Sequence, residues 1–136
     1  MGAVSPLPFA DAAFMQKVQD RVIVPTLEGL RSEGIHYQGF VFIGLMKVGD
    51  DPWVIEYNVR MGDPETEVVL PLLDVDMVSL LFAATQGSLD EQKFTVRQEH
   101  CVTVMLVSGG YPEAYVKGKH ITGLERVQDS QVFHAG

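Results

Sequence analysis

The hydrophobic pattern of residues 11–34 predicts a helix that covers a core. Apolar side chains recur there at multiples of four residues and therefore share one face: Phe14, Val18, Val22 and Leu30. Asp11 stands where an N-cap residue is expected. Pro25 lies inside the segment and must kink or split the helix, because proline lacks the N–H group that a continuous helix uses.

Two strand-like runs follow, separated by residues that favour a turn. Residues 39–47 are apolar on both faces, which is typical of a strand buried in the middle of a sheet. Residues 49–52 are dense in turn formers, so the chain should fold back onto residues 53–60 as an antiparallel hairpin. We interpret Asp50 and Asp51 as turn residues rather than metal ligands, since acids at hairpin tips generally serve the turn.

Strand signals increase in the second half of the chain. Asp63 is placed to cap a helix whose first residue is Pro64, and residues 76–86 predict another helix that a glycine would end. Shorter runs predict strands over residues 94–97, 100–107, 119–124 and 131–134. These elements predict an α+β fold in which residues 1–95 precede a β-rich part, residues 96–136.

Composition excludes several classes of function. The 136 residues are 46% hydrophobic, as in a packed globular protein, and their formal net charge is −8. This charge offers no basic surface for nucleic acid or for an anionic membrane. Cys101 is the single cysteine, which excludes an internal disulfide and favours a reducing compartment. No apolar run is long enough to span a bilayer, so we expect a cytoplasmic protein.

Polar side chains alternate along residues 54–60. On a strand, Glu56, Asn58 and Arg60 would point to one side and the apolar residues between them to the other. Carboxylate and amide oxygens suit a cation such as magnesium, and a guanidinium suits a phosphate. By pattern alone, the solvated face of an edge strand fits Glu56 and Asn58 equally well. Gly62 and the expected helix start that follow favour a nucleotide site.

The first residues of the chain offer a further candidate. Residues 1–8 contain glycine and two prolines, which indicates a loop. Their Met1-Gly2-Ala3 start is flexible enough for close approach to a ligand, which makes Gly2 a candidate substrate-binding residue.

The run Val54-Ile55-Glu56-Tyr57-Asn58-Val59-Arg60-Met61-Gly62-Asp63-Pro64-Glu65-Thr66 closely resembles the C-terminal signature of ATP-grasp ligases. More narrowly, it is similar to the phosphoribosylamine–glycine ligase family. Further segments match that family in order and spacing: residues 1–6, 39–46, 109–112 and 132–136. The resemblance therefore spans essentially the whole chain.

The resemblance implies roles for individual residues. Glu56 and Asn58 would ligate the Mg²⁺ or Mn²⁺ ion that bridges the ATP phosphates. Arg60 would be the catalytic residue, near the transferring phosphoryl group or the substrate carboxylate. Asp63 and Gly2 would help to bind substrate. Residues 39–47 contain no acid, so a third metal ligand is not assigned.

The resemblance also implies a fold and a reaction. The fold would be the C-terminal half of an ATP-grasp domain, mainly antiparallel sheet with covering helices, followed by an incomplete β-rich subdomain. The reaction would join glycine to 5-phosphoribosylamine in de novo purine biosynthesis, with ATP as co-substrate and a glycyl phosphate intermediate. We expect the chain to be a C-terminal portion, inactive without N-terminal domains of the same enzyme and able to self-associate through exposed apolar surface.

Two alternatives stay open at this point. The chain could belong to another ATP-grasp carboxylate–amine ligase, or it could be a non-catalytic module whose acidic face binds only a metal or a partner.

Overall fold

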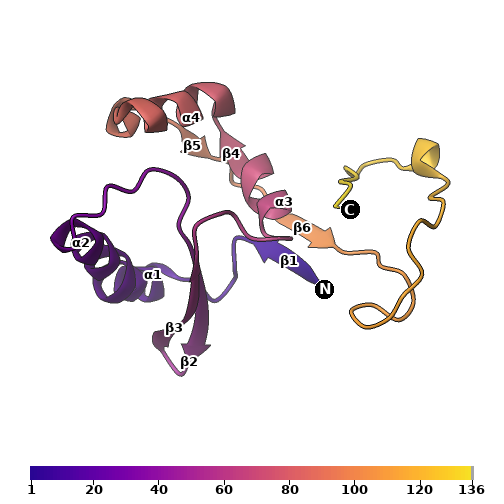
Figure 1. Cartoon of the computed structure of the whole chain (residues 1–136), viewed down its shortest axis with the longest axis horizontal. Helices are drawn as coiled ribbons and strands as arrows, with labels where there is room; N and C mark the ends of the chain where they lie inside the picture. Colours follow the sequence, from indigo (N-terminus) through magenta and orange to yellow (C-terminus); the bar gives the residue numbers. More distant parts are fainter. Residues whose placement is uncertain (136) are drawn as a thin grey trace. The chain divides into compact units, whose positions relative to one another are not determined.

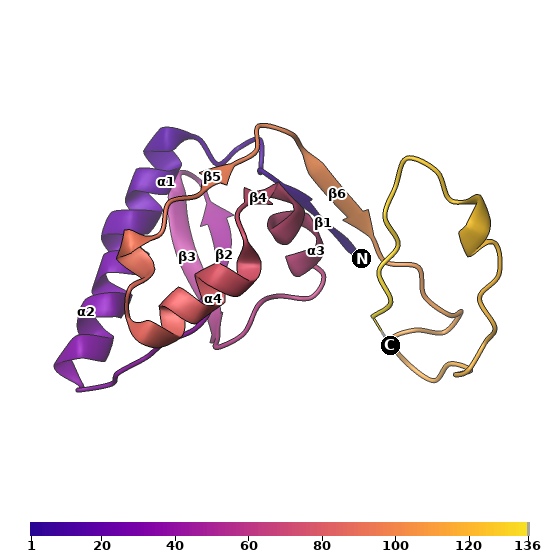
Figure 2. The ribbon, with the colours of Figure 1, turned by 90° about the horizontal axis from the view of Figure 1, so that it is seen from above.

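The computed structural model describes residues 1–135, which divide by their contacts into two units (Figures 1 and 2). Residues 2–103 form the larger unit, and Met1 with the segment from Val104 onwards forms the smaller one. In chain order the elements of the larger unit are β1 (Gly2–Ser5), α1 (Ala12–Val18), the π-helical segment η1 (Gln19–Ile23), α2 (Val24–Ser32), β2 (Phe42–Val48), β3 (Asp51–Asn58), α3 (Thr66–Val69), the 3-10 segment η2 (Leu70–Leu72), β4 (Leu73–Asp74), α4 (Met77–Gln86), the 3-10 segment η3 (Leu89–Glu91), β5 (Thr95–Val96) and β6 (Cys101–Val104), whose last residue belongs to the smaller unit. Helices and antiparallel strand pairs together confirm the α+β prediction.

The predicted first helix is confirmed as three helical segments in direct succession. The N–H of Phe14 donates to the Asp11 carboxylate over 2.8 Å, so Asp11 is the N-cap. Pro25 lies at the start of α2, directly after the π-helical segment η1. In that segment the N–H of Val24 bonds back five residues, to the carbonyl of Gln19. The wider π-turn accommodates the proline ring without ending the helix.

The end of α2 follows a Schellman motif. The N–H of Gly34 bonds to the carbonyl of Arg31, and the N–H of Ile35 bonds to that of Leu30. Gly34 has a φ of +69°, the left-handed conformation that this motif requires and that glycine adopts without steric cost. Gly34 therefore ends α2, as glycine does in many natural helices.

The core of the larger unit is built mainly by helical residues. The buried apolar side chains are Phe14, Val18, Val22, Val68, Leu72 and Ala83. Three of the four residues predicted for the buried face of the first helix are among them, while Leu30 is half-buried. Val68 of α3 is the most enclosed, at 2% exposure.

The predicted hairpin is confirmed as β2 and β3, with Val48 opposite Asp51. Gly49 and Asp50 form the two-residue turn, and Gly49 has a φ of +60°. The turn is fixed to the helices by ion pairs. Arg21 Nη1 lies 2.8 Å and Lys17 Nζ 3.2 Å from Asp51 Oδ1. Figures 1 and 2 both show α1 and α2 beside the hairpin.

The prediction that residues 39–47 form a strand in the middle of a sheet is wrong. Within residues 1–135, β2 pairs with β3 alone. Met46 is 54% and Val48 55% exposed. The reason is that α1 and α2 cover one side of this two-stranded sheet, while the other side is covered only near Phe42, by the chain around Gly62. Apolar side chains farther along that second side therefore remain in solvent.

The predicted loop at residues 1–8 is also partly wrong, because residues 2–5 form β1, which pairs with β6. β4 pairs with β5 in antiparallel orientation. The helix predicted over residues 76–86 is confirmed as α4. Asp76 caps it by accepting a 2.8 Å hydrogen bond from the N–H of Ser79, and this bond lowers the pKa of the Asp76 carboxyl.

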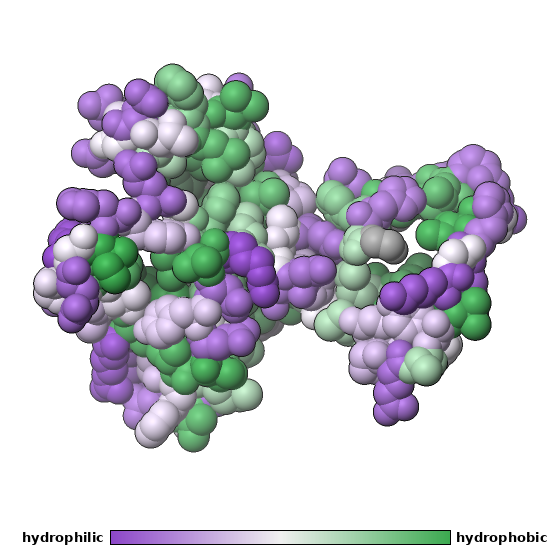
Figure 3. All heavy atoms as spheres, in the orientation of Figure 1, coloured by the Kyte–Doolittle hydropathy of each residue, from purple (hydrophilic) through white to green (hydrophobic). Residues whose placement is uncertain are grey.

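Apolar surface remains exposed around α4 and the hairpin. Val78 is 79% and Phe82 66% exposed on α4, and Trp53 is 63% exposed on β3. Figure 3 shows apolar residues gathered on the visible face near α4 and at the opposite end of the larger unit. Single exposed apolar residues are ordinary, but a helix face that exposes two large ones is unusual.

The smaller unit has little regular structure over its described residues. After β6, the 3-10 segment η4 (Leu124–Arg126) is the one regular element as far as residue 135. The strands predicted over residues 119–124 and 131–134 are therefore wrong, and that over 100–107 is confirmed only for β6. A strand needs a hydrogen-bonded neighbour. β6 has one in β1, whereas residues 119–124 and 131–134 have none in the described chain. The predicted division between residues 95 and 96 stays a prediction.

Among the described residues, no helix combines the length and the apolar character that crossing a membrane requires.

Asp11→Ala should destabilise the protein by about 1 kcal/mol, because the N–H of Phe14 loses its capping partner. Urea unfolding followed by circular dichroism measures the change. Glu28→Ala, on an exposed position of α2, is the matched control and should leave stability nearly unchanged. Equal stability of the two variants would contradict a capping role for Asp11.

Asp51→Asn should weaken the dependence of stability on pH. The hydrogen bond from Lys17, with that from Arg21, lowers the pKa of the Asp51 carboxyl. A carboxyl with a lowered pKa in the folded state stabilises above its ordinary pKa, and this contribution is lost as the pH falls through the folded pKa. The effect should be small because the pair is exposed. Thermal unfolding from pH 6 down to about 2 measures it.

The control for this comparison is Asp90→Asn, since Asp90 forms no ion pair within residues 1–135. The wild-type protein and this control should lose the same stability on acidification. If Asp51→Asn lost as much stability on acidification as the wild-type protein and Asp90→Asn do, the ion pairs of Asp51 would not stabilise the hairpin.

Candidate metal and phosphate site on the hairpin

A β-bulge determines which face of the hairpin carries the polar residues. From the turn, the register pairs Val48 with Asp51 and continues to Leu45 opposite Val54. It then shifts, so that Ile55 has no partner and Gly44 lies opposite Glu56. Because side chains alternate, an extra residue moves every later side chain of β3 to the other face.

Glu56 and Asn58 lie on the same face of β3, as predicted, and contact each other. Asn58 Nδ2 donates to Glu56 Oε1 over 3.0 Å. Glu56 is exposed and Asn58 half-buried. Within residues 1–135, no three His, Cys, Asp or Glu side chains gather as a metal site, so this pair offers one carboxylate and one amide group. Rotating the Asn58 amide by 180° exchanges its nitrogen and oxygen atoms, which would place Asn58 Oδ1 beside Glu56 Oε1.

The other face of the hairpin is the one that packs on the helices. Lys47 Nζ lies 5.7 Å from the centre of the Phe14 ring, and the Tyr57 hydroxyl lies 3.0 Å from Thr26 Oγ1. Tyr57 and Lys47 belong to this covered face by the register. Glu56 and Asn58 therefore point away from α1 and α2, and Glu56 is exposed to solvent there.

Arg60 lies outside the strand, which corrects the prediction that β3 extends to residue 60. β2 begins at Phe42, opposite Asn58, so no neighbouring strand extends the ladder to Arg60. The Arg60 guanidinium donates to the carbonyl of Met61 over 3.0 Å and is exposed. The strand alternation that was expected to align Arg60 with Glu56 and Asn58 does not reach it.

The helix predicted from Pro64 begins later, at Thr66, and Asp63 is not its cap. Glu65 is the N-cap, without a side-chain hydrogen bond. The N–H of Thr66 bonds to the carbonyl of Gly62 over 3.0 Å, and the Thr66 hydroxyl donates to the same oxygen. This closed turn precedes α3 and leaves the side chain of Asp63 exposed.

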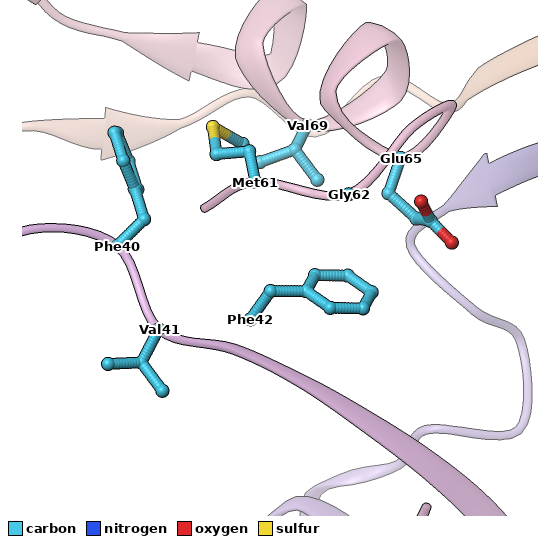
Figure 4. Close-up of a pocket in the computed structure, with 7 residues that line it drawn as sticks. All are labelled: Phe40, Val41, Phe42, Met61, Gly62, Glu65 and Val69. Carbon is cyan, nitrogen blue, oxygen red and sulfur yellow. The ribbon is translucent and has the colours of Figure 1, made fainter. Parts of the chain in front are cut away.

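A small cleft lies between the start of β2 and this turn (Figure 4). Its volume is about 160 Å³, and its lining is Phe40, Val41, Phe42, Met61, Gly62, Glu65 and Val69. Nearly all of it is apolar, with the Glu65 carboxylate as its charged group. Figure 4 shows the ring of Phe42 between the β2 strand and the Gly62 turn. The cleft suits an apolar group rather than a phosphate.

Gly2 lies in β1 and is exposed, so it belongs to a paired strand and not to a flexible loop. Its strand partner β6 is tied to α3. Thr103 Oγ1 donates to Glu67 Oε2 over 2.6 Å. β6 thus holds the helix that follows the Gly62 turn. No pattern in the sequence indicated this contact, because Thr103 and Glu67 lie far apart along the chain.

Comparisons with known proteins point to one family. Residues 1–66 match the family model described as "Phosphoribosylglycinamide synthetase, ATP-grasp (A) domain". A phosphoribosylamine–glycine ligase of Chlorobaculum tepidum is 45% identical over the whole chain, and one of Caldanaerobacter subterraneus is 38% identical. The chain belongs to the phosphoribosylamine–glycine ligase family. Glu56, Asn58 and Arg60 all fall within the matched residues.

A solved structure supports the same membership in this ligase family. The phosphoribosylamine–glycine ligase of Thermotoga maritima has a TM-score of 0.74 and 36% identity, over 90% of this chain and 30% of that one. The chain spans 33% of the length of the Chlorobaculum tepidum and Caldanaerobacter subterraneus relatives. It therefore corresponds to one part of a phosphoribosylamine–glycine ligase fold.

Gly62→Ala should destabilise the protein by about 1–3 kcal/mol, because the added methyl group has no room. Its Cβ would lie 2.9 Å from Phe42 Cε2 and would collide with the Glu65 carboxylate. Chemical unfolding measures the loss.

The matched control is Gly29→Ala in α2, where a Cβ would meet nothing within 4 Å. This variant should gain about 1 kcal/mol, because alanine favours a helix interior. Stabilisation by both alanines would show that the Gly62 turn tolerates a side chain.

Proposed function

We propose that this chain is the part of a phosphoribosylamine–glycine ligase that holds the divalent cation and the phosphates of ATP. The observation that supports this most directly is the Glu56–Asn58 pair, joined by a 3.0 Å hydrogen bond and facing away from the helices. The reaction of the whole enzyme would join glycine to 5-phosphoribosylamine and release ADP and phosphate.

The side chains of this pair fit Mg²⁺ or Mn²⁺. Both ions prefer oxygen ligands, and Mg²⁺ is commonly held by one or two protein groups together with phosphates and water. One carboxylate and one amide oxygen on an exposed face leave the remaining positions open for those ligands. The ion would neutralise charge on the transferring phosphoryl group. Residues 39–47 still supply no acid as a third ligand.

Arg60, Asp63 and Gly2 are the proposed contacts beyond the metal. The exposed guanidinium of Arg60 follows directly after β3 and would bind the transferring phosphoryl group or the glycine carboxylate. Asp63 is exposed in the next turn and would help to shape the substrate pocket. Gly2 would allow a substrate to approach the β1 backbone closely.

The chemistry requires charge neutralisation and positioning rather than a protein nucleophile. An oxygen of the glycine carboxylate forms a bond to the terminal phosphorus of ATP while the bond to ADP breaks, which gives an acyl phosphate. The amine of 5-phosphoribosylamine then attacks the acyl carbon, and inorganic phosphate leaves with the electron pair of the broken bond. Arg60 and the metal ligands would hold the charged groups in line during the first step.

The remaining proposals concern the setting of the chain. The partners would be ATP, glycine, 5-phosphoribosylamine and other domains of the same enzyme, in the cytoplasm. The large exposed side chains on α4 and β3 also favour self-association of the isolated chain. Sedimentation equilibrium tests this, and a monomer at all concentrations contradicts it.

Glu56→Gln should lower turnover by about 100-fold or more, because the variant loses the charge that attracts the cation while keeping the shape of the side chain. A suitable protein is a chimera in which this chain replaces the aligned third of the Chlorobaculum tepidum ligase. ADP release that depends on both glycine and 5-phosphoribosylamine is the measurement. The isolated chain should show none.

The matched control is Glu28→Gln on the exposed side of α2, which should keep the turnover of the unaltered chimera. Folding of each variant is compared by circular dichroism. Undiminished turnover in Glu56→Gln would contradict a role for Glu56 in catalysis. A non-catalytic binding module would then be the better interpretation.

A further inference from the structure

Gly44 is the residue directly opposite Glu56 in the hairpin. Residues opposite each other in an antiparallel pair point to the same side of the sheet. A Cβ added at Gly44 would lie 3.1 Å from Glu56 Cγ, 3.6 Å from Glu56 O and 3.8 Å from Glu56 N. These nearest atoms all belong to Glu56. The missing side chain of Gly44 therefore gives space to one residue in particular.

The bulge explains why a glycine stands at this position. If the register of residues 51–54 continued unchanged, Ile55 would lie opposite Gly44, and Glu56 would lie opposite Ile43 on the face that packs on the helices. The unpaired Ile55 moves Glu56 across to the open face. Glu56 then lies against the backbone of β2, where a Cβ on residue 44 would stand 3.1 Å from its Cγ, closer than side chains usually pack.

We propose that Gly44 is a positioning residue for Glu56, whose absent side chain allows the rotamer that presents the carboxylate beside Asn58. This inference rests on the proposed metal site and extends it to the neighbouring strand. Gly44 touches no ligand itself and acts only through Glu56.

A purely conformational role for this glycine does not explain the position. Gly44 has no positive φ, so alanine is compatible with its backbone. Alanine usually stabilises a strand interior relative to glycine, because it loses less conformational entropy on folding. Any loss of stability caused by Gly44→Ala must then come from crowding, and the crowded atoms are those of Glu56.

The first experiment compares Mn²⁺ binding and the rotamer of Glu56 in the wild-type chain and in Gly44→Ala. The electron paramagnetic resonance signal of free Mn²⁺ gives the affinity, and NMR scalar couplings of the Glu56 side chain give χ1. We expect Gly44→Ala to weaken Mn²⁺ binding about 10- to 100-fold, as when a group that orients a metal ligand is altered. We also expect a changed Glu56 rotamer. Gly29→Ala is the control and should change neither.

The second experiment is a double-mutant cycle that does not depend on metal. Gly44→Ala should lower the thermal midpoint in the wild-type chain but raise it in a Glu56→Ala background, where the crowded Cγ is gone. A fall of equal size in both backgrounds would overturn the proposal, since the cost would then be independent of Glu56. If Gly44→Ala does not fold in the wild-type chain but folds with Glu56→Ala, the proposal is supported.

The outcomes separate this inference from the proposed function. If Glu56→Gln binds Mn²⁺ as tightly as the wild-type chain, the metal assignment fails, and the rotamer and the cycle still decide the role of Gly44. If Glu56→Gln abolishes binding while Gly44→Ala keeps wild-type affinity, the metal assignment stands and the positioning role is overturned. An unchanged Glu56 rotamer in Gly44→Ala overturns it as well.

Discussion

The register of the β2–β3 hairpin is the constraint on which the candidate site depends. A strand side chain has only two directions available, and one unpaired residue, Ile55, exchanges them for everything that follows in β3. Because of that residue, Glu56 and Asn58 leave the face that meets the helices and contact each other on the open face. Tyr57, between them, is turned to the helices and meets Thr26. The bulge thus separates residues that pack from residues that are free to bind.

The helices α1 and α2 support this separation by covering one side of the hairpin. Asp51 is held by Lys17 and Arg21 at the turn, and Tyr57 is held by Thr26 near the other end of β3. These contacts are individually weak because they are exposed, but they act at both ends of the strand. The π-turn before Pro25 allows the helical segments to run on without a break along the hairpin. The fold therefore attaches β3 to the helices through Asp51 and Tyr57, while Glu56 between them stays exposed.

Local signals in the sequence were accurate where a few neighbouring residues decide the outcome. Asp11 caps its helix through a hydrogen bond three residues away, and Gly49 lies in the hairpin turn, both as predicted. Such contacts form within one turn of chain and depend little on the rest of the fold. The cap predicted at Asp63 is the exception, since the N-cap of α3 is Glu65. The Glu-x-Asn pattern likewise placed both side chains on one face. Signals that depend on distant partners were less accurate, as for the strands expected over residues 119–124 and 131–134, which have no neighbour to pair with.

By itself, the sequence determined the family, the first helix with its Asp11 cap, the hairpin and the shared face of Glu56 and Asn58, because each follows from residues close together in the chain or from an extended match. The tertiary structure decided which face of the hairpin is open, that Arg60 lies beyond the last paired residue, and that Gly44 stands against Glu56. These features depend on the register between two strands. An alternation pattern with period two shows which residues of one strand share a face, but it carries no information on where the neighbouring strand contributes one residue fewer.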